Sequence, residues 1–327
     1  MRRIRMPLLG LVVVLLVLAV AGAIYQAIAT ELAERAYPPP GEMVGVGGYS
    51  LHINCVGQGS PTVVLDAGSG GFSAQWVRVQ REVSDTTRVC AYDRAGMGWS
   101  EMGPEPRDAK QISSELHTLL KGANIEGPYV LVGHSFGGLY VRTYAARYPD
   151  EVAGVVLVDS SSPKQVSHQP VTRDSNEPQK QSFAVVPRLA RLGASLTARL
   201  GVVRLLSKLA PASPDLPPQQ RAQIDALTPS TRQVTTYALE LLAPTQTLRL
   251  GSLGNKPLAV VTAPKQAEPG WLKLQDDLAT LSSNSIHRVV KGATHSSLLY
   301  ERSEAQATSA AIVEVVVAVR NDRPLAR

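Results

Sequence analysis

The sequence predicts an α/β protein with a mainly parallel sheet and helices on both of its faces. Short apolar runs alternate with amphipathic segments along most of the 327 residues, a pattern typical of such a sheet. One apolar run, 129–132, breaks directly into Gly133-His134-Ser135-Phe136-Gly137 and then a helical pattern. A separate apolar stretch stands at the N-terminus, before the alternation begins.

The N-terminal stretch predicts a membrane anchor. Three arginines within residues 2–5 precede residues 6–30, which carry no charge. About 20 apolar residues span a ~30 Å hydrocarbon layer, and the arginines favour a cytoplasmic N-terminus. We therefore expect a single-pass protein of the cell membrane, with everything after residue 30 extracytoplasmic. The alternative is a signal segment cleaved near Ala21-Gly22-Ala23 and a secreted product, although the run exceeds the 7–15 residues of a typical signal core.

The segment 31–42 contains Pro38-Pro39-Pro40-Gly41 and predicts a stiff linker between the anchor and the domain. The elements expected after it alternate regularly, except over 163–250. We therefore divide the chain into a core of 43–162 and 251–327 and an inserted helical cap of 163–250. Strands are expected at 43–46, 49–56, 62–65, 89–92, 129–132, 155–158, 258–262 and 286–290. Helices are expected around 73–84, 108–121, 136–147, 271–281 and 303–319.

The cap contains an apolar stripe at helical spacing. Its members are Leu189, Leu192, Leu196, Leu200 and Val203. Basic residues are interleaved with it, namely Arg188, Arg191, Arg199, Arg204 and Lys208. The stripe is interpreted as the underside of a lid; the alternative is a helix on a membrane surface.

Ser135 is the candidate nucleophile. In a G-x-S-x-G turn between strand and helix, the serine stands on a strained elbow with its hydroxyl exposed. Gly133 and Gly137 allow the close backbone approach that this turn requires.

Four motifs occur in order along the chain: DAGSGG (66–71), DRAGMGWS (93–100), GHSFGG (133–138) and GATHSSLL (292–299). With them, residues 43–320 resemble the α/β-hydrolases that carry a helical cap, a superfamily that includes bacterial hydrolases with an N-terminal membrane segment. The resemblance implies the α/β-hydrolase fold, with an eight-stranded, mostly parallel sheet. It also implies a structural role for the DRAGMGWS loop, including Asp93.

A serine hydroxyl needs a general base near pH 7. His295 follows the last strand-like run, late in the chain, as the order serine, acid, histidine requires. The acid has two candidates. Asp159 ends the strand-like run 155–158, and a rigid strand end suits a carboxylate that must hold an imidazole. Glu268 stays the alternative, in a Pro-flanked loop after 258–262.

The oxyanion hole requires backbone donors. One is the N–H of Phe136, the residue after the nucleophile. By position in the resemblance, Ser69 supplies the other, from the loop after 62–65.

These residues predict a hydrolase that cleaves a small-molecule ester, or a thioester or amide, through an acyl-enzyme. A C–C hydrolase or a cofactor-free, haloperoxidase-like enzyme would use the same triad, and a non-catalytic binding protein of this fold is a third possibility. No motif suggests a cofactor or a metal site. The formal charge is +6, of which three charges are N-terminal arginines, and no basic block is interleaved with aromatics, so no nucleic-acid partner is expected.

Cys55 and Cys90 lie in two strand-like runs. Taken alone, they fit two buried thiols. The strand order implied by the resemblance, 1-2-4-3-5-6-7-8, makes their strands neighbours, so a disulfide is expected. Export would place it in an oxidising compartment.

Overall fold

The computed structural model describes residues 2–163, 182–243 and 250–325. Its centre is an eight-stranded sheet in the order β1-β2-β4-β3-β5-β6-β7-β8. The first two pairings, β1 with β2 and β2 with β4, are antiparallel, and the others are parallel. The strands are β1 (Glu42–Gly45), β2 (Ser50–Val56), β3 (Val63–Asp66), β4 (Val89–Tyr92), β5 (Tyr129–His134), β6 (Val152–Val158), β7 (Leu258–Thr262) and β8 (Ser285–Val289). The predicted α/β-hydrolase fold is therefore confirmed.

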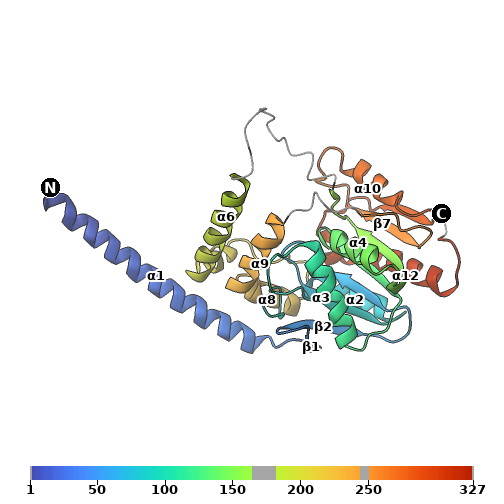
Figure 1. Cartoon of the computed structure of the whole chain (residues 1–327), viewed down its shortest axis with the longest axis horizontal. Helices are drawn as coiled ribbons and strands as arrows, with labels where there is room; N and C mark the ends of the chain where they lie inside the picture. Colours follow the sequence, from blue (N-terminus) through green and yellow to red (C-terminus); the bar gives the residue numbers. More distant parts are fainter. Residues whose placement is uncertain (1, 164–181, 244–249, 326–327) are drawn as a thin grey trace.

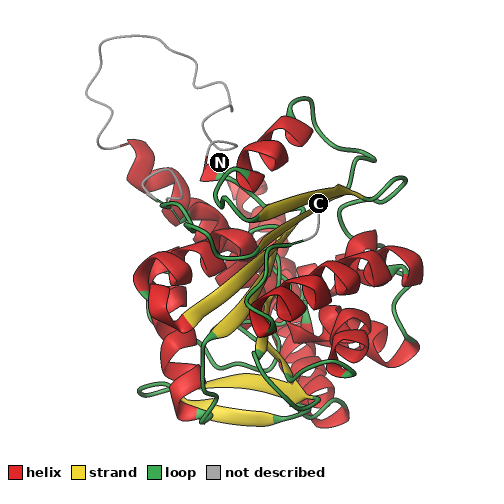
Figure 2. Ribbon diagram, turned by 90° about the vertical axis from the view of Figure 1, so that its right-hand side faces the viewer, coloured by secondary structure: helices red, strands yellow, loops and turns green. Residues whose placement is uncertain are grey.

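Helices cover both faces of the sheet (Figure 2). In β3, the side chains of Val63 and Leu65 enter one apolar core and that of Val64 enters the other, as the two-residue period of a strand requires. The first core packs under α2 and α12, and the second under α3 and α4. The helices around the sheet are α2 (Val77–Ser84), α3 (Ala109–Gly122), α4 (Gly137–Arg147), α10 (Trp271–Ala279), α11 (Ser297–Tyr300) and α12 (Arg302–Arg320).

The N-terminal helix is longer than predicted. Helix α1 spans Arg2–Ala36, so 31–36 are helical rather than part of a linker. After residue 30 the first proline or glycine is Pro38, and the residue before a proline is disfavoured in a helix. The remaining connection is attached to the core, because Trp99 Nε1 donates to the Tyr37 carbonyl (2.8 Å). Ala33 itself is buried in a small apolar cluster with Phe72, Met97, Trp99 and Leu227.

The inserted segment is helical where it is described. It forms α6 (Ser182–Arg199), α7 (Val202–Ser207), α8 (Pro218–Leu227) and α9 (Thr231–Leu242); 164–181 and 244–249 of the predicted cap lie outside the described residues. In Figure 1, α6, α8 and α9 lie between α1 and the sheet. Leu189, Leu192 and Leu196 of the leucine stripe are 57–63% exposed, and two of them, Leu192 and Leu196, line a pocket between α6 and α9. The assignment of the stripe to the underside of a lid stays a prediction.

A disulfide joins Cys55 of β2 to Cys90 of β4. The two residues are direct partners in the antiparallel register of these strands. The bond therefore ties the antiparallel edge of the sheet to its parallel part.

Candidate active site

Ser135 occupies a tight turn between β5 and α4. Its φ is +54°, a left-handed conformation that is uncommon for a residue with a side chain. Its amide donates to the Val158 carbonyl of β6 (3.1 Å), and its carbonyl accepts from the Ser161 amide (3.0 Å). A Cβ at Gly133 would lie 2.5 Å from the Gly137 backbone, so only glycine fits there. The serine is half-buried at the carboxyl edge of the sheet.

The structure brings His295 and Asp159 together from positions far apart in the chain. His295 Nδ1 donates to Asp159 Oδ2 at 2.6 Å. The aspartate side chain is buried, whereas that of the histidine is half-exposed. This bond sets the tautomer, because it places the proton on Nδ1 and leaves Nε2 able to accept one.

Asp159 is held rigidly at the end of β6. Its other oxygen, Oδ1, accepts from the Ala263 amide (3.0 Å) and from Trp271 Nε1 (2.8 Å). Burial raises the pKa of this carboxyl, but the hydrogen bonds from His295, Trp271 and Ala263 outweigh it and hold the pKa below its usual value. Glu268, the alternative acid, is exposed.

His134, next to the serine, supports the His295 loop. Its Nε2 donates to the His295 carbonyl (3.0 Å), and the two imidazole ring centroids lie 4.4 Å apart. Burial, followed by the charge of His295, lowers the pKa of His134 to about 3. The ring is therefore neutral and acts as a fixed donor. The sequence gave no sign of this bond.

The loop after β3 runs beside the serine elbow. A Cβ at Gly68 would lie 3.0 Å from the Ser135 Cβ. Among the described residues, no hydrogen-bond acceptor is recorded for the amides of Ser69 and Phe136. Both predicted oxyanion donors thus remain available at this edge. The hydroxyl of Ser69 is buried without a described partner.

Asp93 organises the DRAGMGWS loop from within. Its carboxylate accepts from the Ser73 amide (2.7 Å), the Trp99 amide (2.9 Å) and His52 Nδ1 (3.0 Å). The carboxylate is fully buried, and it accepts hydrogen bonds from two backbone amides and one imidazole. These contacts fit a structural role.

Arg94, one residue further on, joins three parts of the molecule. Its guanidinium donates to Asp66 at the end of β3 (2.8 Å) and to the carbonyls of Ala67 and Gly68 (2.7 and 2.9 Å). It also makes a two-pronged bond to Glu240 of α9 (3.0 and 2.9 Å). The oxyanion loop is therefore held against the cap by a buried cation. Our sequence reasoning missed this pair; the one available signal was a single carboxylate between apolar residues of α9.

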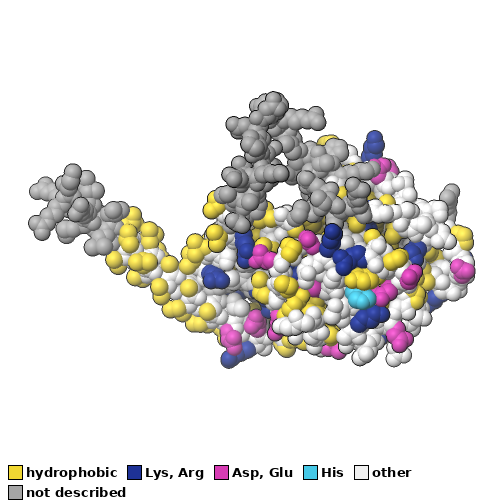
Figure 3. All heavy atoms as spheres, viewed as in Figure 1, with side chains coloured by type: hydrophobic (Ala, Val, Ile, Leu, Met, Phe, Trp, Pro, Cys, Tyr) yellow, Lys and Arg dark blue, Asp and Glu magenta, His cyan; other side chains and the backbone are white. Residues whose placement is uncertain are grey.

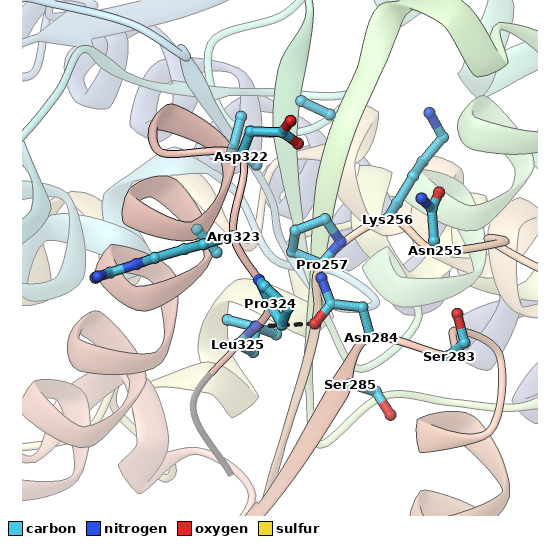
Figure 4. A pocket seen from close by; sticks show the side chains of 13 residues that line it. Asn255, Lys256, Pro257, Ser283, Asn284, Ser285, Asp322, Arg323, Pro324 and Leu325 are labelled. Atoms are coloured by element: carbon cyan, nitrogen blue, oxygen red, sulfur yellow. Dashed lines mark hydrogen bonds between the residues drawn. The ribbon is translucent and has the colours of Figure 1, made fainter.

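Two pockets lined by described residues lie away from the serine elbow. One of about 510 Å³ lies at the opposite, amino edge of the sheet, between Lys256 and Asn284 at the starts of β7 and β8 and the C-terminal residues Asp322–Leu325 (Figure 4). This pocket is therefore separated by the length of the strands from Ser135, His295 and Asp159, which all follow the carboxyl ends of strands. A second, of about 790 Å³, lies between α6 and α9. Within the described ranges, no cluster of His, Cys, Asp and Glu is suited to a metal ion.

Comparison with known proteins identifies the family. Residues 61–299 match the family described as alpha/beta hydrolase fold, and the chain belongs to it. Among curated relatives, the uncharacterized protein YqjL of Bacillus subtilis is 35% identical over 103 residues, which cover 32% of this chain and 41% of that protein. The chain spans less than half the length of the curated relatives that it matches; three of these matches cover 16–41% of the relative.

Solved structures show the same fold at low identity. A thermophilic esterase from Thermogutta terrifontis has a TM-score of 0.59 and 21% identity, over 85% of this chain and 98% of that one. The enol-lactonase from Burkholderia xenovorans has a TM-score of 0.60 and 20% identity, over 84% and 100%. At this identity the likeness extends to the fold alone.

Proposed function

We propose that this chain is a serine hydrolase that cleaves an ester, or a thioester or amide, through an acyl-enzyme. The observation that carries the proposal is the 2.6 Å bond between His295 Nδ1 and the buried Asp159, made at the edge of the sheet where Ser135 forms the elbow. A buried carboxylate on a base of this kind stabilises the imidazolium that forms during catalysis.

In the proposed reaction, Ser135 Oγ attacks the substrate carbonyl while His295 Nε2 takes its proton. The amides of Ser69 and Phe136 hold the oxyanion. His295 returns the proton to the leaving group, and the acyl-enzyme forms. Water, deprotonated by His295, then attacks the ester of Ser135 and releases the acid. Asp159 stays ionised throughout, in keeping with its lowered pKa.

A fluorophosphonate probe tests this assignment, because it phosphonylates only an activated serine. We expect labelling of the wild type at Ser135 and none of Ser135→Ala, together with a loss of esterase kcat on the order of 10⁶-fold. A panel of p-nitrophenyl esters of rising chain length, run beside aryl amides, then defines the substrate class. Labelling that persists in Ser135→Ala would contradict the nucleophile. An unreactive wild type would favour a binding role.

We also propose that α1 anchors the protein in the cell membrane, with the hydrolase domain outside the cytoplasm. Within the described residues, one helical segment, Gly10–Ala36, is long and apolar enough to cross a membrane. The N-terminal arginines before it favour this orientation. The disulfide supports it as well, since such bonds persist in oxidising compartments.

A further inference from the structure

The cap has an apolar surface that the hydrolase core does not cover. Six leucines on and after α6 and α7 are 55–82% exposed, and two of them, Leu192 and Leu196, also line the pocket between α6 and α9. We call them the leucine platform: Leu189, Leu192, Leu196, Leu205, Leu206 and Leu209. Single exposed leucines are ordinary, but a contiguous group marks an interaction surface. We infer that the leucine platform docks on the membrane leaflet from which α1 emerges; this inference rests on the proposed membrane anchor.

The corner between α6 and α7 is attached to α1. A Cβ at Gly22 would lie 2.3 Å from the Leu200 carbonyl oxygen, so the two backbones are in contact. The buried Arg204 of α7 donates to Gln26 (2.9 Å) and Thr30 (3.1 Å) of α1. Gln26 in turn donates to the Pro229 carbonyl (2.9 Å). Figure 1 shows the cap helices beside the C-terminal part of α1, whose N-terminal part projects away from the body.

The charge pattern of α1 fixes the depth of this corner. The uncharged stretch is bounded by Arg5 and Glu31. A ~30 Å hydrocarbon layer takes about 20 helical residues, so the layer begins between residues 6 and 11 and ends between 25 and 30. Every such placement contains Gly22, which contacts Leu200. At 1.5 Å per residue, the α6–α7 corner therefore lies about 5–12 Å inside the edge of the hydrocarbon layer.

The polar residues near this corner fit the headgroup region. Lys208 Nζ lies 5.8 Å from the ring centroid of Tyr25, and both residue types concentrate at membrane interfaces. Arg199 and Lys208 are exposed, so their charged ends can reach the headgroups while their stems lie along apolar surface. Hydrophobic side chains cover the projecting part of α1 (Figure 3). A bilayer is therefore the occupant whose chemistry and position both match the leucine platform.

Depth-dependent quenching tests the docking on the full-length protein. Cys55 and Cys90 are bonded to each other. A single introduced cysteine therefore provides the free thiol that a bimane label modifies. Leu206→Cys reports on the leucine platform and Val13→Cys on α1. Leu272→Cys is the matched control, an exposed leucine of α10. The proteins are placed in phosphatidylcholine–phosphatidylglycerol vesicles with or without brominated acyl chains.

We expect brominated lipid to quench the labels at Leu206 and Val13 at least twofold and to leave the label at Leu272 unchanged. Quenching at Val13 with none at Leu206 overturns the docking and leaves the anchor intact. The label at Leu206 could also be shielded from aqueous iodide yet insensitive to brominated lipid. This result would mean that a second copy of the chain covers the leucine platform, and it also overturns the docking. No quenching at Val13 refutes the anchor and the docking together. Leu192→Cys repeats the measurement at a second site, and fluorophosphonate labelling checks that each variant is folded.

Discussion

At the scale of single residues, the candidate site depends on two backbone conformations that side chains rarely adopt. Ser135 and Asp159 have φ values of +54° and +41°. Such positions cost of order 1–3 kcal/mol and persist only where the surroundings fix them. Hydrogen bonds to β6 and β7 do so here, because the amide of Ser135 bonds to Val158 and that of Asp159 to Val261 (2.7 Å).

The acid can be identified by comparing two isosteric variants. Asp159→Asn removes the charge that orients and stabilises His295, and we expect kcat to fall on the order of 10³–10⁴-fold. Glu268→Gln alters an exposed side chain and should leave kcat near the wild-type value. Steady-state kinetics on one p-nitrophenyl ester decides between them. A larger loss in the Glu268 variant would show that the acid is wrongly assigned.

His134 makes the protein sensitive to acid. Its pKa is 6.5 in the unfolded reference and about 3 when buried, so between these values the unfolded chain binds the additional proton. The free energy of unfolding therefore falls as pH drops from 6.5 towards 3. His134→Gln keeps an N–H donor but does not titrate. Between pH 6.5 and 5, the free energy of unfolding of this variant should therefore fall by about 2 kcal/mol less than that of the wild type.

Urea denaturation of both proteins at pH 8, 6.5 and 5 measures this difference. Other titrating groups contribute equally to the two proteins and cancel in the comparison. Parallel curves of unfolding free energy against pH would mean that His134 is protonated in the folded protein.

At the scale of elements, helix α9 is the part of the cap most firmly attached to the core. Gln233 accepts from the Gly98 amide (2.9 Å) and donates to the Gly70 carbonyl (3.0 Å), and Glu240 binds the buried Arg94. One of these two loops, the one that carries Gly70, runs beside the serine elbow. The position of this helix is therefore coupled to that of the oxyanion loop.

Two ion pairs between core and cap allow a matched test. Arg94–Glu240 is fully buried, whereas Arg191–Glu105 is about half-exposed. Glu240→Gln leaves a buried cation underpaired and should cost roughly 3–5 kcal/mol of unfolding free energy. Glu105→Gln should cost less than about 1 kcal/mol. Chemical denaturation compares the two, and equal losses would contradict the view that the buried pair holds the cap.

At the scale of the whole molecule, α1 is both a candidate membrane span and a part of the domain. Ala33 lies in an apolar cluster with residues of the core, and Gln26 bonds to Arg204 and Pro229 of the cap. Removal of a signal segment after Ala23 would leave the remaining part of α1 docked but would delete its contact at Gly22.

We therefore expect the mature protein to keep its N-terminal segment. Intact-mass measurement of protein extracted from its native membrane should give the mass of the chain with residues 1–23 present. Resistance to alkaline carbonate extraction should accompany it. A mass that lacks these residues, with the activity in the soluble fraction, would support the secreted alternative.

The sequence by itself determined the α/β class and the candidate nucleophile, because both depend on local patterns. Alternating apolar runs predicted both ends of every strand to within three residues, and the Gly-flanked turn after β5 predicted the elbow at Ser135. These features depend on the spacing of neighbouring residues, which a chain shows directly. Helix α1 extended past its predicted end because the first strong breaker after residue 30 is Pro38.

Tertiary structure alone decided which carboxylate lies against His295 and which way the cap presents its leucines. Asp159 and His295 are 136 residues apart, and they meet only because the parallel register of β6, β7 and β8 aligns their carboxyl ends. The spacing of the leucines predicted that they share one face of a helix, but it did not predict which way that face points in the folded protein. That direction depends on the backbone contact of Gly22 with Leu200 and on the bonds of Arg204 to α1. Contacts between distant segments carry no local signature, so spacing alone does not predict them.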